Sequence, residues 1–450
     1  MNLTLIHPAI GHKRGENYIR SWQMEPLPAA AIAGLTPPSV SIRFYDDRME
    51  SIPYDEPTGA VVMSLETYTA KRAYQIASEF RRRRVPVIVG GFHASLCPTE
   101  AERYADAVVV GEAEEVWGGV LDDLRAGRLK KRYRADRPAS LSSIRMNRTI
   151  FAGKRYLPVR LLETGRGCPY ACHFCAVQTF YDRTYRRRPV DALLAEIQSL
   201  KSGAELFFFV DDNFAGDIAA AKDFLRALAP LRVRWVTQLS IHAAHDEEFL
   251  DALAKSGCRG VLIGFESLDA DTLASMNKPF NTMRGGYGRA LSNLKKYGIR
   301  VYGTFVFGYD RDTEQTVEES VDFALEHHFY IAAFNHLTPF PGTPLYDQLA
   351  GERRLRYPAW WLDDRYRYND IPFAPRRMPP EALTDLCLRA RRRFYSLRGI
   401  LARSVRAPNR GDFFMWRNFF PINWMHRRDV SGRNGYPLGD ETWRGRLIEA

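Results

Sequence analysis

Three cysteines in one short loop carry the strongest chemical signal in this sequence. Cys168, Cys172 and Cys175 are separated by three and then by two residues, in a loop flanked by glycine. A structural zinc site normally has four protein ligands, and His173, wedged between two of the cysteines, is poorly placed to be the fourth. Three cysteines leave one iron of a [4Fe–4S] cluster open for chemistry. The spacing therefore predicts an iron–sulfur cluster in preference to zinc.

The segments that must position this loop alternate between strand and helix patterns. Runs rich in apolar residues are predicted as strands over 158–163, 206–211, 233–240, 260–266, 301–307 and 332–337. Helical patterns over 191–202, 218–229, 247–256 and 287–297 separate them. This alternation predicts a partial (βα)6 barrel of the TIM type, whose C-terminal strand ends carry the chemistry. Polar residues stand at those ends: Glu163, Thr164, Asp211, Asp212, Gln238, Ser240, Glu266, Ser267, His336 and Thr338.

The first 126 residues show a second alternating pattern. Strands are predicted over 3–6, 40–45, 60–63, 85–89 and 107–110, and helices over 27–34, 69–84 and 114–126. Near-continuous apolar strands between helices predict a doubly wound parallel sheet. The domain organisation expected is a Rossmann-type domain over 1–126, a polar linker over 127–156, the barrel over 157–348 and a mainly helical region over 349–450.

The cysteine spacing, with Phe174 just before the last cysteine, resembles the signature of radical S-adenosylmethionine enzymes. The resemblance covers about 158–346 and implies that the three cysteines bind a [4Fe–4S] cluster whose open iron chelates S-adenosylmethionine. It also implies reductive cleavage of that cofactor to a 5′-deoxyadenosyl radical. The fold implied is a six-unit βα barrel, in agreement with the predicted strands.

The same resemblance implies a set of residues that bind S-adenosylmethionine. The strand over 260–266 resembles the glycine-rich strand beside the adenine, and Ser240 and Gln238 stand where polar residues contact the ribose or carboxylate. The family's Gly-Gly-Glu is replaced here by residues 210–213, in which carboxylates can hold the methionyl ammonium. The residues expected at this cofactor are Phe174, Asp211, Asp212, Gln238, Ser240, Gly264 and Glu266.

A doubly wound domain before such a barrel resembles the cobalamin-binding domain of one branch of this family. Residues 338–346 also resemble a segment of that branch. Candidate cobalamin residues follow the predicted strand ends: Ser64, Glu66, Thr67, Gly90, Gly91, His93, Ser95, Gly111 and Glu112. The Asp-x-His-x-x-Gly motif, whose histidine ligates cobalt, is absent. Two alternatives follow: cobalamin bound without a protein imidazole, which we expect, or a domain that has lost it. For His93, a loop histidine without a metal role is the preferred interpretation.

Composition and charge constrain the partners. The chain of 450 residues has 45% hydrophobic and 26% charged residues, which is typical of globular proteins. No apolar run approaches the ~18–20 residues that span a bilayer, and the N-terminus lacks a secretory signal pattern. We therefore expect a cytoplasmic protein. The net charge is +11, and residues 351–450 contain 21 Arg, no Lys and 11 Asp or Glu.

The arginine-rich C-terminal region allows several interpretations. A helix is predicted over 381–402, followed by an aromatic and basic segment over 409–428. A helical lid on the barrel is the first interpretation, contact with a membrane surface the second, and oligomerisation another. Nucleic acid is not expected, because the region lacks lysine and any RNA-binding motif.

The function predicted is a radical S-adenosylmethionine enzyme of the methyltransferase type. We expect cobalamin-dependent methylation, or another radical change, at an unactivated carbon of a small or lipid-like metabolite, with a flavodoxin or ferredoxin as reductant. One alternative is a cobalamin-free radical enzyme that performs cyclisation, C–C coupling or dehydrogenation. Two others are an RNA-modifying or RNA-binding iron–sulfur protein and a non-catalytic iron–sulfur interaction protein.

Overall fold

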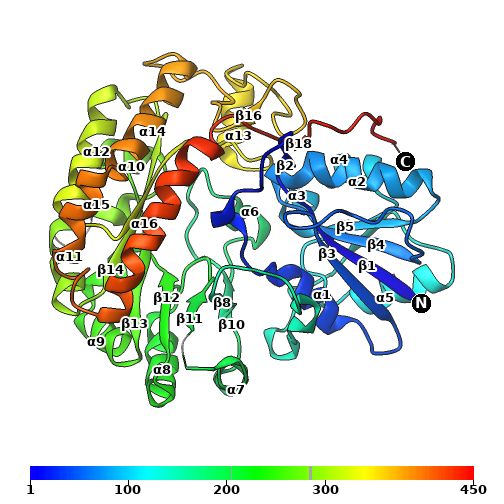
Figure 1. The fold of residues 1–450 in the computed structure, drawn as a ribbon, viewed down its shortest axis with the longest axis horizontal. Coiled ribbons are helices and arrows are strands. Elements are labelled where there is room, and N and C mark those ends of the chain that lie inside the picture. Colours follow the sequence, from blue (N-terminus) through cyan, green and yellow to red (C-terminus); the bar gives the residue numbers. More distant parts are fainter. Residues whose placement is uncertain (204, 283–285, 450) are drawn as a thin grey trace.

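The computed structural model describes residues 1–203, 205–282 and 286–449 and places two parallel sheets side by side (Figure 1). The N-terminal sheet has the order β3-β1-β4-β5-β6-β7, with every pairing parallel. Its strands are β1 (Asn2–His7), β3 (Ser41–Asp46), β4 (Ala60–Ser64), β5 (Val87–Gly90), β6 (Ala107–Val110) and β7 (Arg132–Arg134). The order reverses between β1 and β4, and ligands of open α/β sheets bind outside the C-terminal strand ends at such a point.

Helices cover both faces of this sheet, which explains why its strands are apolar on both sides. One face packs on α1 and α5, and the other on α2 and α4, in two separate hydrophobic clusters. The helices are α1 (Leu27–Leu35), α2 (Ala70–Arg82), α3 (Gly91–Leu96), α4 (Pro98–Tyr104) and α5 (Trp117–Arg125). The doubly wound sheet expected from the sequence is confirmed.

The segment over 127–156 does more than link the domains. Its residues Arg132–Arg134 form β7, which pairs with β6 as a further strand of the N-terminal sheet. Only Tyr133 of the three is buried. A strand of three residues with two exposed arginines has no apolar run, so the sequence pattern alone does not reveal it.

The second sheet has the order β15-β14-β13-β12-β11-β8, again with every pairing parallel. Its strands are β8 (Val159–Leu162), β11 (Leu206–Phe209), β12 (Arg234–Gln238), β13 (Cys258–Glu266), β14 (Arg300–Phe307) and β15 (Ile331–His336). The helices on its outside are α7 (Val190–Leu200), α8 (Ile218–Leu228), α9 (Glu247–Lys255), α10 (Ala270–Ser275), α11 (Gly286–Lys296), α12 (Glu314–Glu326) and α13 (Pro344–Gly351). The predicted partial barrel is confirmed, and the bounds of all six predicted strands lie within two residues of those in the structure.

The cysteine loop follows β8. The elements around it are β9 (Gly165–Gly167), β10 (Tyr185–Arg187) and α6 (Ala176–Phe180). In Figure 1, α6 lies in the space between the barrel and the N-terminal domain. The loop therefore faces the region where the two sheets approach each other.

The C-terminal region is mainly helical, as expected, but the single helix predicted over 381–402 is wrong. The chain forms α14 (Pro380–Phe394) and α15 (Leu397–Ser404), which are separated at Ser396. The hydroxyl of Ser396 accepts a hydrogen bond from Gly399 N and caps the second helix. A serine within a helical pattern is compatible with both a cap and a helix interior, so the sequence pattern left the break undetected.

The longest described helix, α16 (Phe413–Arg433), runs along the side of the barrel (Figure 1). The chain then returns to the N-terminal domain, where β18 (Gly439–Asp440) pairs with β2 (Gly11–His12). Before it, β17 (Tyr436–Pro437) pairs with β16 (Arg367–Tyr368). The C-terminal region therefore joins the two domains on one side of the molecule. No helix among the described residues is long and apolar enough to cross a membrane.

Candidate active site

The cysteine loop is fixed from several directions. β9 pairs with β10, and Gly167 at the end of β9 adopts φ +84°. A Cβ atom at Gly167 would lie 2.0 Å from the carbonyl oxygen of Thr184, so the turn requires glycine. The backbone N–H of His173 donates to the carbonyl of Met276 (2.9 Å), and Leu345 N–H donates to the carbonyl of His173 (3.1 Å). The loop is thus held by its own hairpin, by the end of α10 and by α13.

The three thiols of this loop are free and half-buried. Asn213 Nδ2 donates to Cys168 Sγ at 3.8 Å. Burial raises the pKa of all three thiols, to about 12 for Cys172, and the Lys278 ammonium opposes the rise at Cys172. Among the described residues, no three His, Cys, Asp or Glu side chains already converge as they would around a metal ion. The donor set, three free thiols on one fixed loop beside an amide donor and an ammonium, fits a cluster held by three thiolates.

The two carboxylates at the end of β11 have different surroundings. Asp211 accepts hydrogen bonds from the backbone N–H of Thr164 (2.7 Å) and Gly165 (3.2 Å), and its second oxygen accepts from the Thr164 hydroxyl. Among the described residues, Asp212 accepts one hydrogen bond, from Gly167 N–H at 2.9 Å. Burial raises the pKa of both carboxyl groups to about 6. Asp211 is therefore occupied in holding the loop, and Asp212 retains an oxygen for a ligand.

A second charged group lies at the end of β13. Glu266 adopts φ +61°, and its Oε1 lies 2.7 Å from Lys278 Nζ in a buried ion pair. A Cβ atom at Gly264 would lie 2.1 Å from Glu266 Oε1 and 2.8 Å from Lys278 Nζ. The absence of a side chain at Gly264 therefore leaves the space that the Glu266 carboxylate and the Lys278 ammonium occupy above the strand. Lys278 lies close enough to the cysteine loop for its positive charge to lower the pKa of Cys172.

The remaining residues expected at S-adenosylmethionine lie at neighbouring strand ends. Gln238 ends β12, and Ser240 follows it with its N–H donating to Asn213 Oδ1 at 3.3 Å. Phe174 packs against the core of the barrel. The strand order brings the ends of β11, β12 and β13 next to one another. The structure therefore gathers the expected residues at one edge of the barrel sheet, next to the cysteine loop.

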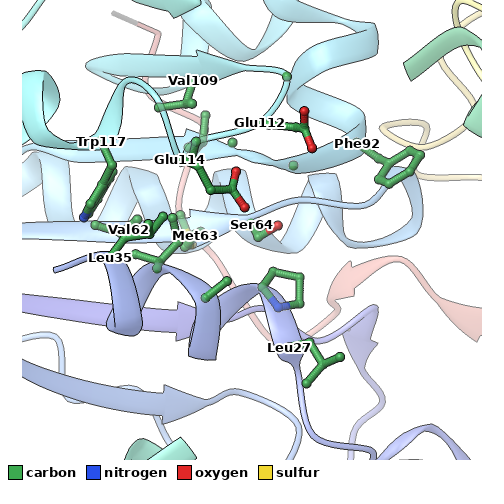
Figure 2. A pocket seen from close by; sticks show the side chains of 18 of the residues that line it. Leu27, Leu35, Val62, Met63, Ser64, Phe92, Val109, Glu112, Glu114 and Trp117 are labelled. Atoms are coloured by element: carbon green, nitrogen blue, oxygen red, sulfur yellow. The ribbon is translucent and has the colours of Figure 1, made fainter. Parts of the chain in front are cut away.

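A cavity of about 190 Å³ lies at the C-terminal edge of the N-terminal sheet. Figure 2 shows the carboxylates of Glu112 and Glu114 near Ser64, with Trp117 and Phe92 at opposite ends of the view. The walls beneath them are apolar and come from α1 and from β4, β5 and β6: Leu27, Leu35, Val62, Ile88 and Val109. The barrel contributes Glu163, Arg166, Phe180 and Tyr181 to the same cavity. The cavity therefore lies between the two domains and close to the cysteine loop.

The cobalamin candidates divide into two groups at this cavity. Those that line it are Ser64, Gly90, Gly91, Gly111 and Glu112; those that do not are Glu66, Thr67, His93 and Ser95. His93 is fully buried, with Nε2 3.0 Å from Glu100 Oε1. Ser95 Oγ accepts from Gly111 N–H and donates to the carbonyl of Gly91, both at 2.8 Å. Ser95 thus supports the cavity from behind by joining its two glycine turns.

Comparison with known proteins places this geometry in a family. Residues 162–324 match the radical SAM superfamily. Bacteriochlorophyllide d C-12(1)-methyltransferase of Chlorobaculum tepidum is 30% identical over 394 residues, which cover 85% of each chain. The chain belongs to the radical SAM superfamily and is an enzyme of its methyltransferase type. Bacteriochlorophyllide d C-8(2)-methyltransferase of the same organism is 29% identical over 84% of this chain and 87% of its own.

Solved structures agree with this radical SAM fold over nearly the whole chain. The radical S-adenosylmethionine methyltransferase TsrM from Kitasatospora setae, solved with cobalamin and a [4Fe–4S] cluster, matches with a TM-score of 0.65 and 17% identity. The match covers 95% of this chain and 99% of TsrM. The cobalamin-dependent enzyme OxsB matches 95% of this chain with a TM-score of 0.65 and 12% identity, over 71% of its own length. These likenesses show that both domains and the C-terminal region follow one known arrangement.

One arginine connects the two halves of this radical SAM enzyme. Arg166, on β9, lies 2.8 Å from Glu112 and 2.7 Å from Glu114, both of which belong to the N-terminal domain. It also lies 2.9 Å from Glu163 on its own domain. All four side chains are at least four-fifths buried. Arg166 therefore neutralises a group of carboxylates at the point where the cavity meets the cysteine loop.

We expect Arg166→Gln to destabilise the protein strongly. The substitution removes the cation that three mostly buried carboxylates share; Glu112 keeps Arg186 at 2.9 Å, whereas Glu114 and Glu163 lose the ion pair that Arg166 forms with them. Breaking a buried ion pair typically costs about 3–5 kcal/mol. Arg311→Gln is the matched control, because Arg311 also contacts two carboxylates but is 55% exposed, where ion pairs contribute about 0–1 kcal/mol. Chemical denaturation followed by circular dichroism measures both. Equal losses in the two variants would contradict this account of Arg166.

Several residues of the site were not predicted from the sequence. Asn213, Lys278 and Arg166 contact the cysteine loop or its neighbours, yet each is an ordinary polar residue in an ordinary context. Asn213 directly follows the two aspartates, and that position after a predicted strand was an available signal. Lys278 reaches Glu266 from a loop after α10, and no local pattern indicates such a contact.

Proposed function

We propose that this radical SAM enzyme is a cobalamin-dependent methyltransferase that acts at an unactivated carbon of a small or lipid-like metabolite. The observation that carries the proposal is the cavity between the domains, which opens beside the cysteine loop. This chemistry requires an electron donor, for which we propose a reductant such as a flavodoxin or ferredoxin. The division into a Rossmann-type domain and a barrel supports the proposal, because both parts contribute walls to this cavity.

Cys168, Cys172 and Cys175 are proposed to hold the [4Fe–4S] cluster. When bound, the cluster and S-adenosylmethionine supply a 5′-deoxyadenosyl radical, and cobalamin supplies a transferable methyl group. The chain's own residues position these groups. Asp211 holds the loop through the backbone of Thr164 and Gly165.

The binding of S-adenosylmethionine is assigned to residues beside that loop. We assign the methionyl ammonium to Asp212, because Asp211 is buried and already accepts three hydrogen bonds from the loop. Phe174, Gln238, Ser240, Gly264 and Glu266 surround the same strand ends. The small Gly264 leaves room for a ring to approach the strand, and the buried pair of Glu266 with Lys278 fixes the charge there.

The cavity fits the cobalamin assignment for its lining residues. Gly91 adopts φ +91°, and a Cβ atom there would lie 2.5 Å from Ser64 Oγ. Gly111 adopts φ +80°, so both turns at the cavity depend on glycine. Apolar walls below a polar rim suit one part of a large ligand that has a polar end, and a cavity of about 190 Å³ holds only such a part, so the rest of the ligand extends beyond it. We propose that the lining residues contact cobalamin: Ser64, Gly90, Gly91, Gly111 and Glu112. The other four candidates are proposed to support the walls of the cavity without contacting cobalamin: Glu66, Thr67, His93 and Ser95.

The metal content of anaerobically purified protein tests this proposal. We expect close to four irons and one cobalt per chain after reconstitution, and transfer of an isotopically labelled methyl group from S-adenosylmethionine to cobalamin. Four irons without cobalt would favour the cobalamin-free alternative. A protein that contains neither iron nor cobalt would exclude both the cobalamin-dependent enzyme and the cobalamin-free alternative.

We also propose that the enzyme contacts an anionic membrane surface through α15 and α16. Apart from Met1, the large hydrophobic side chains that are exposed among the described residues all lie on these two helices or, for Val405, directly after α15: Leu397, Leu401, Val405, Phe413, Phe420 and Trp424. Phe413 is 73% exposed. The exposed Arg398 and Arg417 lie on α15 and α16, and the exposed Arg406 and Arg410 lie in the turns between these helices; within the described ranges none of the four has a carboxylate within 4.0 Å. Apolar side chains among unpaired arginines are typical of a surface that lies on anionic lipid.

We expect the wild-type protein to sediment with phosphatidylglycerol vesicles and not with phosphatidylcholine vesicles. Phe413→Ser should weaken binding about tenfold or more, because burying such a side chain contributes about 1.5–3 kcal/mol. Arg398→Glu should weaken it as well, whereas Arg14→Glu, an exposed arginine of the N-terminal domain, should not. Equal binding to both lipids, or equal effects of the two arginine variants, would argue against the contact.

A further inference from the structure

A small cavity lies where the open edge of the barrel meets the C-terminal helices. β15 is the last strand of its sheet, and α14 covers its free edge: the Tyr395 hydroxyl donates to the carbonyl of Ala332 at 2.9 Å. Beside this contact is a cavity of about 40 Å³ between Tyr302, Asn335, Arg391, and Arg433 of α16. Val301, Phe305 and Phe307 on one face of β14 are buried in the hydrophobic core. Tyr302 alternates with them along the strand, so its side chain points to the other face, toward the interior of the barrel. The cavity therefore adjoins the space in which a substrate would lie.

Two donors of residues that line this cavity lack acceptors. Arg433 Nε and Asn369 Nδ2 are buried and have no hydrogen-bond partner. Asn369 is 93% buried, since only 7% of it is exposed. Arg391 donates from Nε to the carbonyl of Phe334 at 2.9 Å, and its Nη2 lies 3.4 Å from Asn335 Oδ1. Buried donors without acceptors are rare in proteins, because leaving them unpaired costs free energy.

Positive charge in the cavity is not balanced by the protein. Of the described residues that line it, none is Asp or Glu. Across residues 1–203, 205–282 and 286–449, neither Arg391 nor Arg433 has a carboxylate within 4.0 Å. Arg433 instead donates to the Ser21 hydroxyl and lies over the Trp22 ring at 5.5 Å.

The acidic groups nearby are already engaged, and the local field is positive. Asp429 accepts from Ser21 N–H at 3.1 Å and from its hydroxyl at 2.6 Å, and Asp370 accepts from Arg367 N–H at 2.8 Å. Burial lowers the pKa of His426, another lining residue, to about 4, and Arg433 acts in the same direction. His426 is therefore neutral near pH 7, and the net charge of the lining comes from the two arginines.

We propose that Arg391, Arg433 and Asn369 bind a carboxylate group of the substrate. Guanidinium groups match the planar geometry of a carboxylate, which accepts several charge-assisted hydrogen bonds. A volume of about 40 Å³ admits one such group but no ring, so the body of the substrate extends into the barrel. The inference rests on the proposed function and narrows it: the substrate is an organic acid whose carboxylate is anchored away from the reacting carbon.

Matched ligands test the anchor without any turnover. The probes are pheophorbide a, a chlorin with one free carboxylate, and its methyl ester, titrated by fluorescence into the reconstituted full-length protein. We expect the acid to bind at least tenfold more tightly than the ester. Arg391→Gln and Arg433→Gln should each abolish this preference, whereas Arg392→Gln, which alters the exposed neighbour on α14, should keep it. Equal binding of acid and ester by the wild type, or a preference that survives both variants, would overturn the inference.

A second pair of probes separates this inference from the choice of substrate. If neither chlorin binds, the lipid-like or chlorin-like substrate class is wrong, and calorimetric titration with benzoate and benzamide decides the anchor. Binding of benzoate alone, lost in Arg433→Gln and retained in Arg392→Gln, supports it. Binding of neither compound overturns it. Inorganic phosphate is the remaining probe, and an anion site that takes phosphate but not benzoate also overturns it.

Discussion

Cys168→Ala is expected to abolish 5′-deoxyadenosine formation and the brown colour of the reconstituted protein. Cys168 follows Gly167, whose backbone allows only glycine, and Asn213 Nδ2 donates to its sulfur. Loss of a residue that hydrogen-bonds to a metal ligand typically lowers metal affinity or activity about 10–100-fold. Loss of one of the three ligands themselves should have a larger effect. Anaerobic reconstitution, absorbance near 400 nm and chromatography of the nucleoside products measure the effect.

The control for this substitution is Cys97→Ala. Cys97 is also free and half-buried, but it lies in the N-terminal domain between α3 and α4. We expect Cys97→Ala to retain iron, colour and nucleoside formation. A Cys168→Ala protein with wild-type iron content and nucleoside formation would remove Cys168 from the cluster and, with it, the proposed role of the loop.

Gly91→Ala is expected to lower cobalamin affinity by at least tenfold while nucleoside formation continues. The added Cβ atom would lie 2.5 Å from Ser64 Oγ and 2.9 Å from the backbone of Leu65, at a residue with φ +91°. Backbone strain of this kind costs about 1–3 kcal/mol, and its relief must move the turn that lines the cavity. The barrel is a separate sheet, so its chemistry should persist without cobalamin.

Gly118→Ala provides the comparison for this second variant. Gly118 lies on α5, next to Trp117 of the same cavity, and a Cβ atom there meets no atom within 4 Å. We expect its cobalt content to equal that of the wild type. If Gly91→Ala binds one cobalamin per chain with unchanged affinity, the cavity beside Gly91 is not the cobalamin site.

The sequence predicted the parts of this enzyme that depend on local pattern. The strand over 107–110 has the same bounds in the structure, because an apolar run between turn residues is a local property. The three cysteines identified the family for a similar reason, since their spacing within eight residues is the motif itself. The sequence also indicated turns such as the one at Gly91, because a backbone conformation with positive φ strongly favours glycine.

The different roles of neighbouring residues were not predictable in this way. Asp211 and Asp212 are adjacent and identical in type, but only the structure shows that Asp211 accepts three hydrogen bonds from Thr164 and Gly165. The short strand β7 and the break at Ser396 were missed because neither has an apolar run or a strong helix-breaking residue. Local pattern reports how a segment folds, and it does not report which polar atoms remain free afterwards.

The amino-acid sequence by itself determined the two α/β sheets, the cysteine loop and the membership of the radical SAM superfamily, because spacing and periodicity encode them within single segments. Only the tertiary structure decided which side chains face a common space. Arg166 meets Glu112 across 54 positions of chain, and Arg391 and Arg433 face one cavity from two helices. Such contacts depend on how distant segments are placed, and charge and burial act through distance in space, not through distance along the chain.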